Sequence, residues 1–297
     1  MTEQKFGGSW TEIKLTCLRK YLKAYRHIFV YNVNARYLNT WFVDAFAGTG
    51  SRIDSSSSEE LSLFKDVYRD DETSQYRDGS AMIALGLAEP FDQYLFIDKS
   101  GQSLSTLSER IKEEHSSLFS RCAFEPGDAN QVLQKWCSQR DWKRERAVVF
   151  LDPYGMQVDW STIEVLARTK GVDLWYLFPL GVGVSRLLTH SGEIQESWRT
   201  RLNLVLGTRD WETRFYQIDN QQPDLFGELH ETTHRTATPS SIEAFIHERL
   251  ASCFEVVADG LRLKNSRSNP MYLLCFAASN KRGAPVALKI ARDILGK

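Results

Sequence analysis

Acidic and glycine residues recur in this chain directly after short apolar runs, which is where α/β proteins place ligand-binding groups. The run WFV is followed by DAFAGTGS, YLFI by Asp98, and VVFL by DPYG. A further acidic residue, Asp128, follows the segment RCAFEP. An unpaired carboxylate at the end of a buried strand is costly, so each of these side chains is expected to have a partner or a ligand.

The glycines and acids together predict a site for an adenosine-containing ligand. Gly48 and Gly50 allow a tight turn that a ligand can approach closely. Asp98 could accept hydrogen bonds from the hydroxyls of a ribose, and Asp128 could accept from an adenine amino group. No third glycine follows Gly50 at dinucleotide spacing, and the chain has no GxxxxGK[ST] phosphate loop. Adenosine without a pyrophosphate fits better, and S-adenosylmethionine is the candidate.

Each of these features also has a simpler explanation. A GxG can be only a tight turn, and an acidic residue after a strand can be the N-cap of the next helix. The argument for a nucleotide-like ligand rests on four such features following four successive strands.

The segment DPYG has the residues needed to hold an amine. The carboxylate of Asp152 and the carbonyl of Pro153 could both accept from an NH2 group, and these contacts would strengthen as positive charge develops on the nitrogen. Tyr154 could stack on a base. Alternatively, Asp152 caps the next helix or pairs with an arginine, and Tyr154 is an ordinary packing aromatic.

Strand and helix patterns alternate over residues 41–181, which predicts an α/β fold with a doubly wound, mostly parallel sheet. Residues 11–31 have the spacing of an amphipathic helix. Residues 52–78 are polar and are expected to form a surface insertion. The predicted organisation is an N-terminal helical extension (1–40), a cofactor-binding core (41–181), a mostly helical insertion (182–250) that could cap the site, and C-terminal antiparallel strands with a helix that complete the core (251–297).

The composition narrows the class of protein. The 297 residues are 42% hydrophobic and carry a net charge of -1, which excludes a globally basic nucleic-acid binder. The five cysteines are scattered without a CxxC pair, so we expect reduced thiols and no zinc site. We find neither a signal sequence nor an apolar membrane span, which predicts a soluble, cytoplasmic protein.

Two further segments have residue types that could act. Arginines and tryptophans that could contact nucleic acid are interleaved over the predicted insertion, namely Arg186, Trp198, Arg199, Arg201, Arg209, Trp211 and Arg214. The alternative is a solvated helical face with tryptophans that pack inward. The segment HETTH matches the letters of a zinc-protease motif, but its surroundings are polar and rich in turn residues.

The glycine turn and DPYG resemble motifs of class I S-adenosylmethionine-dependent methyltransferases that modify exocyclic amines of bases. The matching residues are Asp44, Phe46, Gly48 and Gly50 in the turn and Asp152, Pro153 and Tyr154 in the tetrad. The second proline of the Asp-Pro-Pro-aromatic tetrad is missing here. A longer set of segments, including DGSAMIAL, DLWYLFPLGVGVSRLL and NPMYLLCFAASN, resembles the three-Cys-motif partner proteins. That resemblance implies a methyltransferase-like fold and a partner that carries the three-Cys motif.

The leading hypothesis from the sequence is an S-adenosylmethionine-dependent methyltransferase acting on an exocyclic amine of a nucleic-acid base. The alternative is a non-catalytic or partner-dependent protein on the same fold. A hydrolase that uses HETTH is a third and weaker hypothesis. Metal analysis of the purified protein would separate the third from the others.

Overall fold

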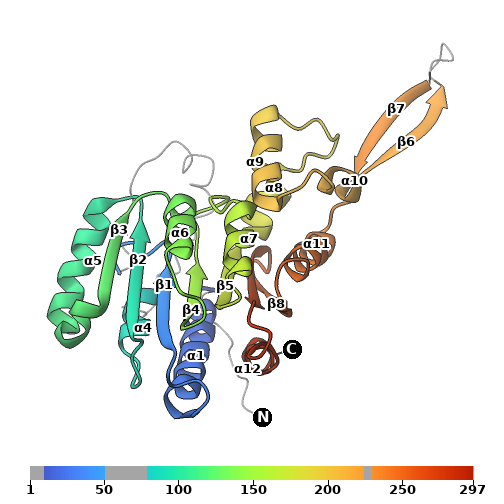
Figure 1. The fold of residues 1–297 in the computed structure, drawn as a ribbon. Helices are drawn as coiled ribbons and strands as arrows, with labels where there is room; N and C mark the ends of the chain where they lie inside the picture. The colour runs from blue at the N-terminus through green and yellow to red at the C-terminus, as the bar shows by residue number, and fades with distance from the viewer. Residues whose placement is uncertain (1–9, 51–78, 224–228, 297) are drawn as a thin grey trace, which may run out of the picture.

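The computed structural model describes residues 10–50, 79–223 and 229–296, and the predicted insertion over 52–78 lies outside them. The described residues form a seven-stranded sheet with the order β3-β2-β1-β4-β5-β9-β8 (Figure 1). The strands are β1 (Asn39–Asp44), β2 (Gln93–Asp98), β3 (Cys122–Pro126), β4 (Glu145–Leu151), β5 (Val172–Phe178), β8 (Val256–Lys264) and β9 (Pro270–Ala278). The first five are parallel, whereas β9 is antiparallel to both β5 and β8. The predicted α/β fold with a C-terminal antiparallel strand pair is confirmed.

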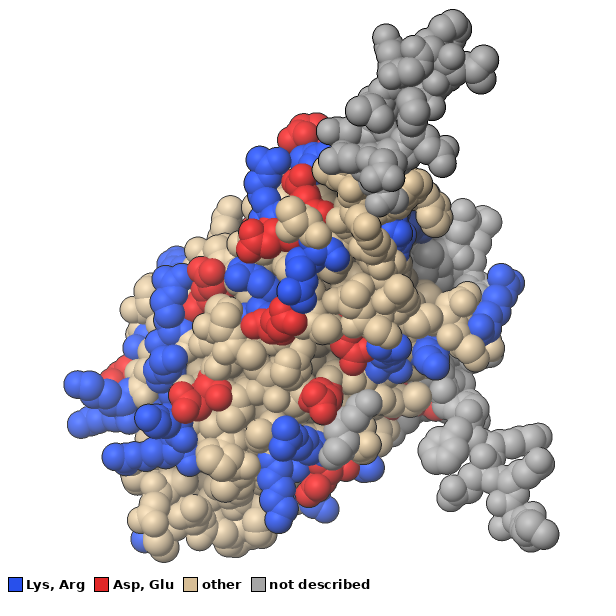
Figure 2. Space-filling view, turned by 90° about the vertical axis from the view of Figure 1, so that its right-hand side faces the viewer, with Lys and Arg blue, Asp and Glu red and all other residues tan. Residues whose placement is uncertain are grey.

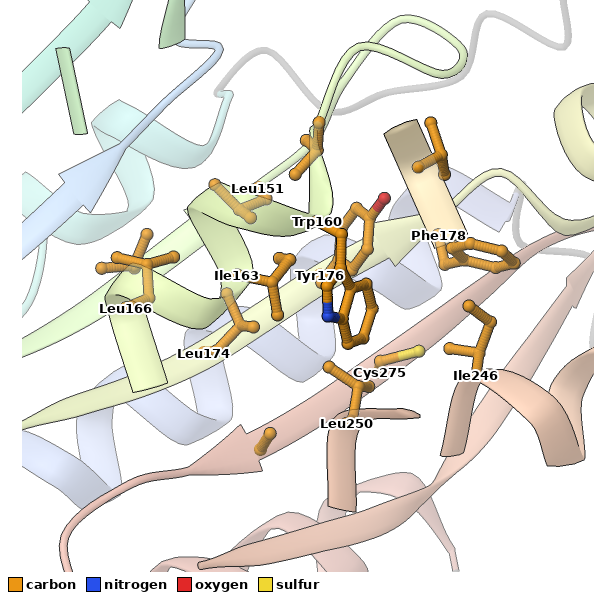
Figure 3. Packing of buried hydrophobic residues seen from close by; sticks show 14 of the residues in the cluster. Leu151, Trp160, Ile163, Leu166, Leu174, Tyr176, Phe178, Ile246, Leu250 and Cys275 are labelled. Atoms are coloured by element: carbon orange, nitrogen blue, oxygen red, sulfur yellow. The ribbon is translucent and has the colours of Figure 1, made fainter. Parts of the chain in front are cut away.

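The strands alternate their side chains between two apolar layers. In β4, Val149 and Leu151 belong to one core cluster, whereas Val148 and Phe150 belong to the other. Because a sheet covered on both faces buries every position, its strands are continuous apolar runs, which is how the sequence marks them. Figure 3 shows part of the first cluster, which includes Trp160 and Tyr176.

Helices cover both faces of the sheet (Figure 1). Residues of α6 (Ala129–Ser138), α7 (Trp160–Arg168), α9 (Glu196–Leu206) and α11 (Pro239–Ala251) contribute to the first cluster. Residues of α1 (Trp10–Tyr31), α4 (Ser80–Leu85), α5 (Gly101–Glu114) and α12 (Ala284–Leu295) contribute to the second. A short 3-10 helix, η1 (Ser116–Arg121), precedes β3. Within these described ranges, no helix has the length and apolar character to cross a membrane.

Helix α1 confirms the helix predicted over 11–31, and it lies against the sheet through polar as well as apolar contacts. Lys14 donates to Asp152 after β4, and Arg26 donates to Thr40 near the start of β1. The helix therefore runs antiparallel to the parallel strands. Midway along it, the Tyr21 hydroxyl donates to Asp173 of β5 at 2.6 Å.

The region 182–250 contains helices, as predicted, and also a two-stranded hairpin that the sequence analysis missed. After β5 come a π-helical turn, η2 (Leu180–Val184), and the short helices α8 (Ser185–Leu187) and α10 (Trp211–Phe215). The hairpin strands β6 (Tyr216–Pro223) and β7 (Leu229–Arg235) pair antiparallel and project from the rest of the chain (Figure 1). Its base is fixed by Arg235, whose guanidinium donates to the carbonyls of Ser185 at 2.9 Å and Leu188 at 2.7 Å.

The segment HETTH lies on strand β7, so its backbone does not have the helical conformation of the zinc motif. His230 and His234 lie on this strand, where four residues span about 13 Å. The zinc motif needs a helix to bring its two histidines to one face one turn apart. Among the described residues, no group of three or more His, Cys, Asp or Glu side chains is arranged to hold a metal ion.

Candidate functional site

The carboxyl ends of four parallel strands lie side by side at one edge of the sheet. Strand β1 pairs with β2 on one side and with β4 on the other, and its last residue, Asp44, is level with Phe96 and Phe150. Asp98 at the end of β2 is level with Pro126 of β3. The order of the strands reverses between β1 and β4, and open α/β sheets bind ligands at that point. The residues singled out in the sequence therefore share one edge.

The glycine turn after β1 is tied to the end of β2. Gly48 has φ +57° and Gly50 has φ +72°, a left-handed conformation that favours glycine. The Gly48 amide donates to Asp98 at 3.0 Å, and the Ala47 amide donates to the Ile97 carbonyl at 2.9 Å. A Cβ atom at Gly48 would meet nothing within 4 Å, whereas one at Gly50 would lie 2.7 Å from Leu107 Cδ1. The turn is thus packed at Gly50 and open at Gly48.

Asp98 orients the turn through its two carboxylate oxygens. One oxygen accepts from Gly48, and the other accepts from the Ser100 amide at 2.7 Å. Ser100, and not Asp98, is the N-cap of α5, where its side chain accepts from the Ser103 amide. Each carboxylate oxygen can accept more than one hydrogen bond, so Asp98 retains acceptor capacity for a ligand.

Asp128 has the helix-capping role that the simpler explanation gives it. Its side chain caps α6 by accepting from the amides of Asn130 and Gln131. Its other oxygen lies 3.5 Å from Lys99 Nζ. The side chain remains partly exposed, and its proposed contact with adenine stays a prediction.

Asp44 is a fully buried carboxyl at the end of the central strand. It accepts from the Phe46 amide at 3.2 Å and from the Ser80 hydroxyl at 2.5 Å. Burial raises the pKa of Asp44 to about 7, although the bonds from Ser80 and Phe46 act in the opposite direction. The charges of Asp152 and Lys14 also influence this pKa, so the three side chains form one electrostatic cluster.

The raised pKa of Asp44 predicts a pH dependence of stability. An aspartate in an unfolded chain titrates near pH ~4, so above that pH the folded state retains a proton that the unfolded state has released. The free energy of unfolding therefore falls as the pH rises toward the folded pKa of about 7. Asp44→Asn removes this contribution. The stability of the variant relative to wild type should rise by about 2–3 kcal/mol between about pH 5 and pH 8 in urea denaturation. A difference that stays constant with pH would contradict the assignment.

The partner of Asp152 is Lys14, which lies 138 residues earlier in the chain. The ammonium of Lys14 donates to Asp152 Oδ2, and the side chains are 6% and 24% exposed. Asp152 does not cap a helix, because Asp159 holds the N-cap position of α7. The Lys14 ammonium also lies 5.3 Å from the ring centre of Trp10 and 6.0 Å from that of Phe150. The alternative from the sequence was an ion pair with an arginine. Asp152 does form an ion pair, but its partner is a lysine of α1.

The sequence around Lys14 contains a signal that this lysine needs a partner. On α1, Lys14 is four residues before Leu18 and seven before Tyr21, and all three are buried. A lysine within the apolar stripe of an amphipathic helix needs a partner, because buried charges are stable only when paired. The identity of that partner depends on how the helix crosses the sheet.

The two residues after Asp152 differ in exposure. Pro153 is buried, whereas the Tyr154 side chain is 59% exposed. Gly155 follows with φ +74°, so the chain turns directly after the aromatic. Tyr154 is therefore largely outside the core, with much of its ring presented to solvent.

The arginine and tryptophan residues of the insertion match the simpler of the two interpretations. Trp211 is fully buried, and its indole donates to Asn203 at 2.8 Å. Four of the arginines lie within 4 Å of carboxylates, namely Arg199, Arg201, Arg209 and Arg214. Figure 2 shows positive and negative side chains interspersed on the face that it presents. This arrangement is typical of a solvated surface.

A cavity of about 340 Å³ lies between α11 and β8, lined among others by Glu243, His247 and Asp259. It contains none of the strand-end residues. His247 and Asp259 are 3.8 Å apart there, and both are well exposed. The cavity is separate from the candidate site.

No protein-family model matches the chain, and no curated protein matches it. Among solved structures, the methyltransferase domain of bacterial CtHen1-C is similar at 12% identity and a TM-score of 0.34, covering 88% of this chain and 98% of that one. An rRNA methylase from Streptococcus thermophilus has 10% identity and a TM-score of 0.30, covering 74% and 94%. A conserved hypothetical protein from Streptococcus pyogenes has 15% identity and a TM-score of 0.31, covering 71% and 94%. These similarities are too weak to support a function. The case for a function therefore rests on the residues at the strand ends.

Proposed function

We propose that the protein is an S-adenosylmethionine-dependent methyltransferase that acts on an exocyclic amine of a nucleic-acid base. One observation supports this most strongly. Asp98 is the last residue of β2 and Asp152 directly follows β4, and these strands lie on either side of β1, which leads into the left-handed glycine turn. An adenosine-containing ligand and an amine could be held at these two positions.

The residues around the turn fit the cofactor. The space beside Gly48 is open, and Asp98 retains acceptor capacity next to it. In the proposal, the turn faces the amino-acid portion of the cofactor, Asp98 accepts from the ribose, and Asp128 accepts from the adenine. The remaining cofactor-binding residues proposed from the motif are Asp44, Phe46, Gly48 and Gly50.

The amine would be held by the residues that follow β4. Asp152 and the Pro153 carbonyl would accept from the NH2 group, and Tyr154 would stack on the base. The cofactor supplies an activated methyl group. The protein contributes acceptors that bind the nitrogen more strongly as it becomes positive, which lowers the barrier. Because a base in a duplex is inaccessible, the target would be flipped out or single-stranded.

The test is methyl transfer to unmodified RNA and DNA from S-adenosylmethionine with a labelled methyl group. Nucleosides released by digestion are separated to identify the product. We expect label in an N-methylated nucleoside and a rate about 100-fold lower in Asp152→Asn. Asp159→Asn, which alters a nearby acid outside the motif, should retain the wild-type rate. Undiminished transfer by Asp152→Asn would disprove the role of Asp152.

A second candidate is a non-catalytic or partner-dependent protein on the same fold. It is favoured by the ion pair of Asp152 with Lys14, which already occupies one acceptor oxygen, and by the missing second proline. The resemblance to three-Cys-motif partner proteins would then indicate a partner that carries the three-Cys motif. Cofactor binding without transfer to any nucleic acid, in the absence of that partner, would support this candidate.

The proposed organisation assigns 41–181 to the cofactor and 182–250 to a cap that contacts the substrate or the partner. The segments 1–40 and 251–297 would complete the core. We place the protein in the cytoplasm, because its five cysteines are all free thiols, as expected in a reducing compartment.

A further inference from the structure

Helix α1 is held in one register by polar pairs along its length. Lys14 pairs with Asp152, Tyr21 with Asp173, and the Arg26 guanidinium lies 3.6 Å from Asp92. Buried polar pairs of this kind contribute little net stability, but a shift of the helix would leave each of them unpaired. The position of the Lys14 ammonium at the end of β4 is thus fixed by contacts that extend over the whole helix.

The ammonium changes the charge of the proposed amine site. Asp152 and the buried Asp44 would otherwise form a cluster of two carboxyls, in which the charge of Asp152 helps to raise the pKa of Asp44. Lys14 contributes one positive charge to this cluster and contacts Oδ2 of Asp152. Oδ1, the other oxygen of this carboxylate, can still accept from an incoming N–H group.

We propose that Lys14 is a positioning residue that neutralises Asp152, so that the site accepts an uncharged amine and rejects an alkylammonium group. This inference rests on the proposed methyltransferase function and assigns the selectivity of its amine site to Lys14. The exocyclic amines of nucleobases are uncharged, whereas lysine side chains and polyamines are cationic at neutral pH.

The physical reason is electrostatic. The methyl donor carries a positive sulfonium, and an alkylammonium substrate would place a further positive charge between it and Lys14. Like charges that lie close together repel strongly in a partly buried site. An uncharged amine needs only a hydrogen-bond acceptor, and Asp152 with Lys14 on its other oxygen provides one in a fixed orientation.

The test compares two ligands that differ by one methyl group and one charge. S-adenosylmethionine has the sulfonium, and S-adenosylhomocysteine does not. We would measure both dissociation constants by calorimetry for wild type, Lys14→Gln, Lys14→Arg and Lys20→Met. Glutamine can still donate to Asp152 but has no charge, arginine keeps the charge, and Lys20 is an exposed lysine of the same helix.

We expect Lys14→Gln to raise the preference for S-adenosylmethionine over S-adenosylhomocysteine by at least about fivefold, because the remaining negative charge then attracts the sulfonium. Lys14→Arg and Lys20→Met should retain the wild-type preference. If Lys14→Gln does not fold, Lys14→Met gives the same comparison.

An equal change in both affinities, or no change in either, would overturn the inference while leaving the cofactor assignment intact. Failure of folded wild type to bind either ligand would instead remove the proposed function, and the inference with it.

Discussion

Asp152→Ala is expected to lower the free energy of unfolding by about 3 kcal/mol, because it leaves a buried ammonium without its partner. Lys14 is 6% exposed and Asp152 is 24% exposed, so the cost falls mainly on the lysine. The surroundings of the ammonium include the rings of Trp10 and Phe150, which cannot replace a carboxylate. Urea denaturation at neutral pH measures the effect.

The double variant Lys14→Met/Asp152→Ala separates this cause from a general disturbance of the loop. Removing both members of a buried pair is often close to neutral, so the double variant should recover at least half of the loss. Asp159→Ala is the matched control, since its carboxylate is 30% exposed and lies 3.9 Å from Arg201. It should cost less than about 1 kcal/mol. A double variant that is less stable than Asp152→Ala would contradict the proposed cause.

Gly181→Ala is expected to destabilise the fold by at least about 3 kcal/mol, because the new methyl group would overlap a backbone atom. A Cβ at this position would lie 1.9 Å from the Pro270 carbonyl oxygen and 3.0 Å from its carbon. The clash lies between the π-helical turn after β5 and the start of β9, so neither side can give way by a side-chain rotation. The same turn is packed against Met156, two residues beyond Tyr154, as a Cβ at Gly183 would lie 2.7 Å from Met156 Cγ.

Gly101→Ala provides the control for this prediction. Gly101 is the first residue of α5, and a Cβ there would meet nothing within 4 Å. Alanine is the better helix former, so this change should be neutral or slightly stabilising. Thermal unfolding of both variants gives the comparison, and a Gly181→Ala protein as stable as wild type would show that the close approach is wrong.

The parallel core was predictable from the sequence because its strands are buried on both faces. Continuous apolar runs such as VVFL stand out from their surroundings, and each ends in an acidic or turn residue. The C-terminal pair β8 and β9 was predictable for a similar reason, since two apolar runs flank a polar turn. That it joins the main sheet beside β5 could not be read from local pattern.

The hairpin of β6 and β7 was not predictable in the same way. Its strands read YQIDNQQP and LHETTHR, which lack the apolar alternation that marks a strand. The anchor that fixes its base, Arg235, acts through carbonyls nearly fifty residues earlier in the chain. Interactions of that kind depend on the tertiary structure and leave no periodic signal.

The candidate site was predictable in its positions but not in its partners. The acids at the ends of β1, β2 and β4 were found from their places in the sequence, and the sheet order brings them together. The ion pair of Lys14 with Asp152 joins residues 138 apart, and it became visible only once α1 was placed on the sheet. Asp128 is a different case, because it caps α6 locally while its proposed contact with adenine stays a prediction.

Calorimetric titration of wild type and Asp98→Ala with S-adenosylmethionine tests the central claim most directly. We expect micromolar binding by wild type, about -8 kcal/mol, and at least about thirtyfold weaker binding by the folded variant. Asp98 holds the glycine turn and would accept from the ribose, so its loss affects the ligand at both contacts. Absence of binding by folded wild type, or equal affinity in Asp98→Ala, would contradict the assignment of this edge of the sheet to the cofactor.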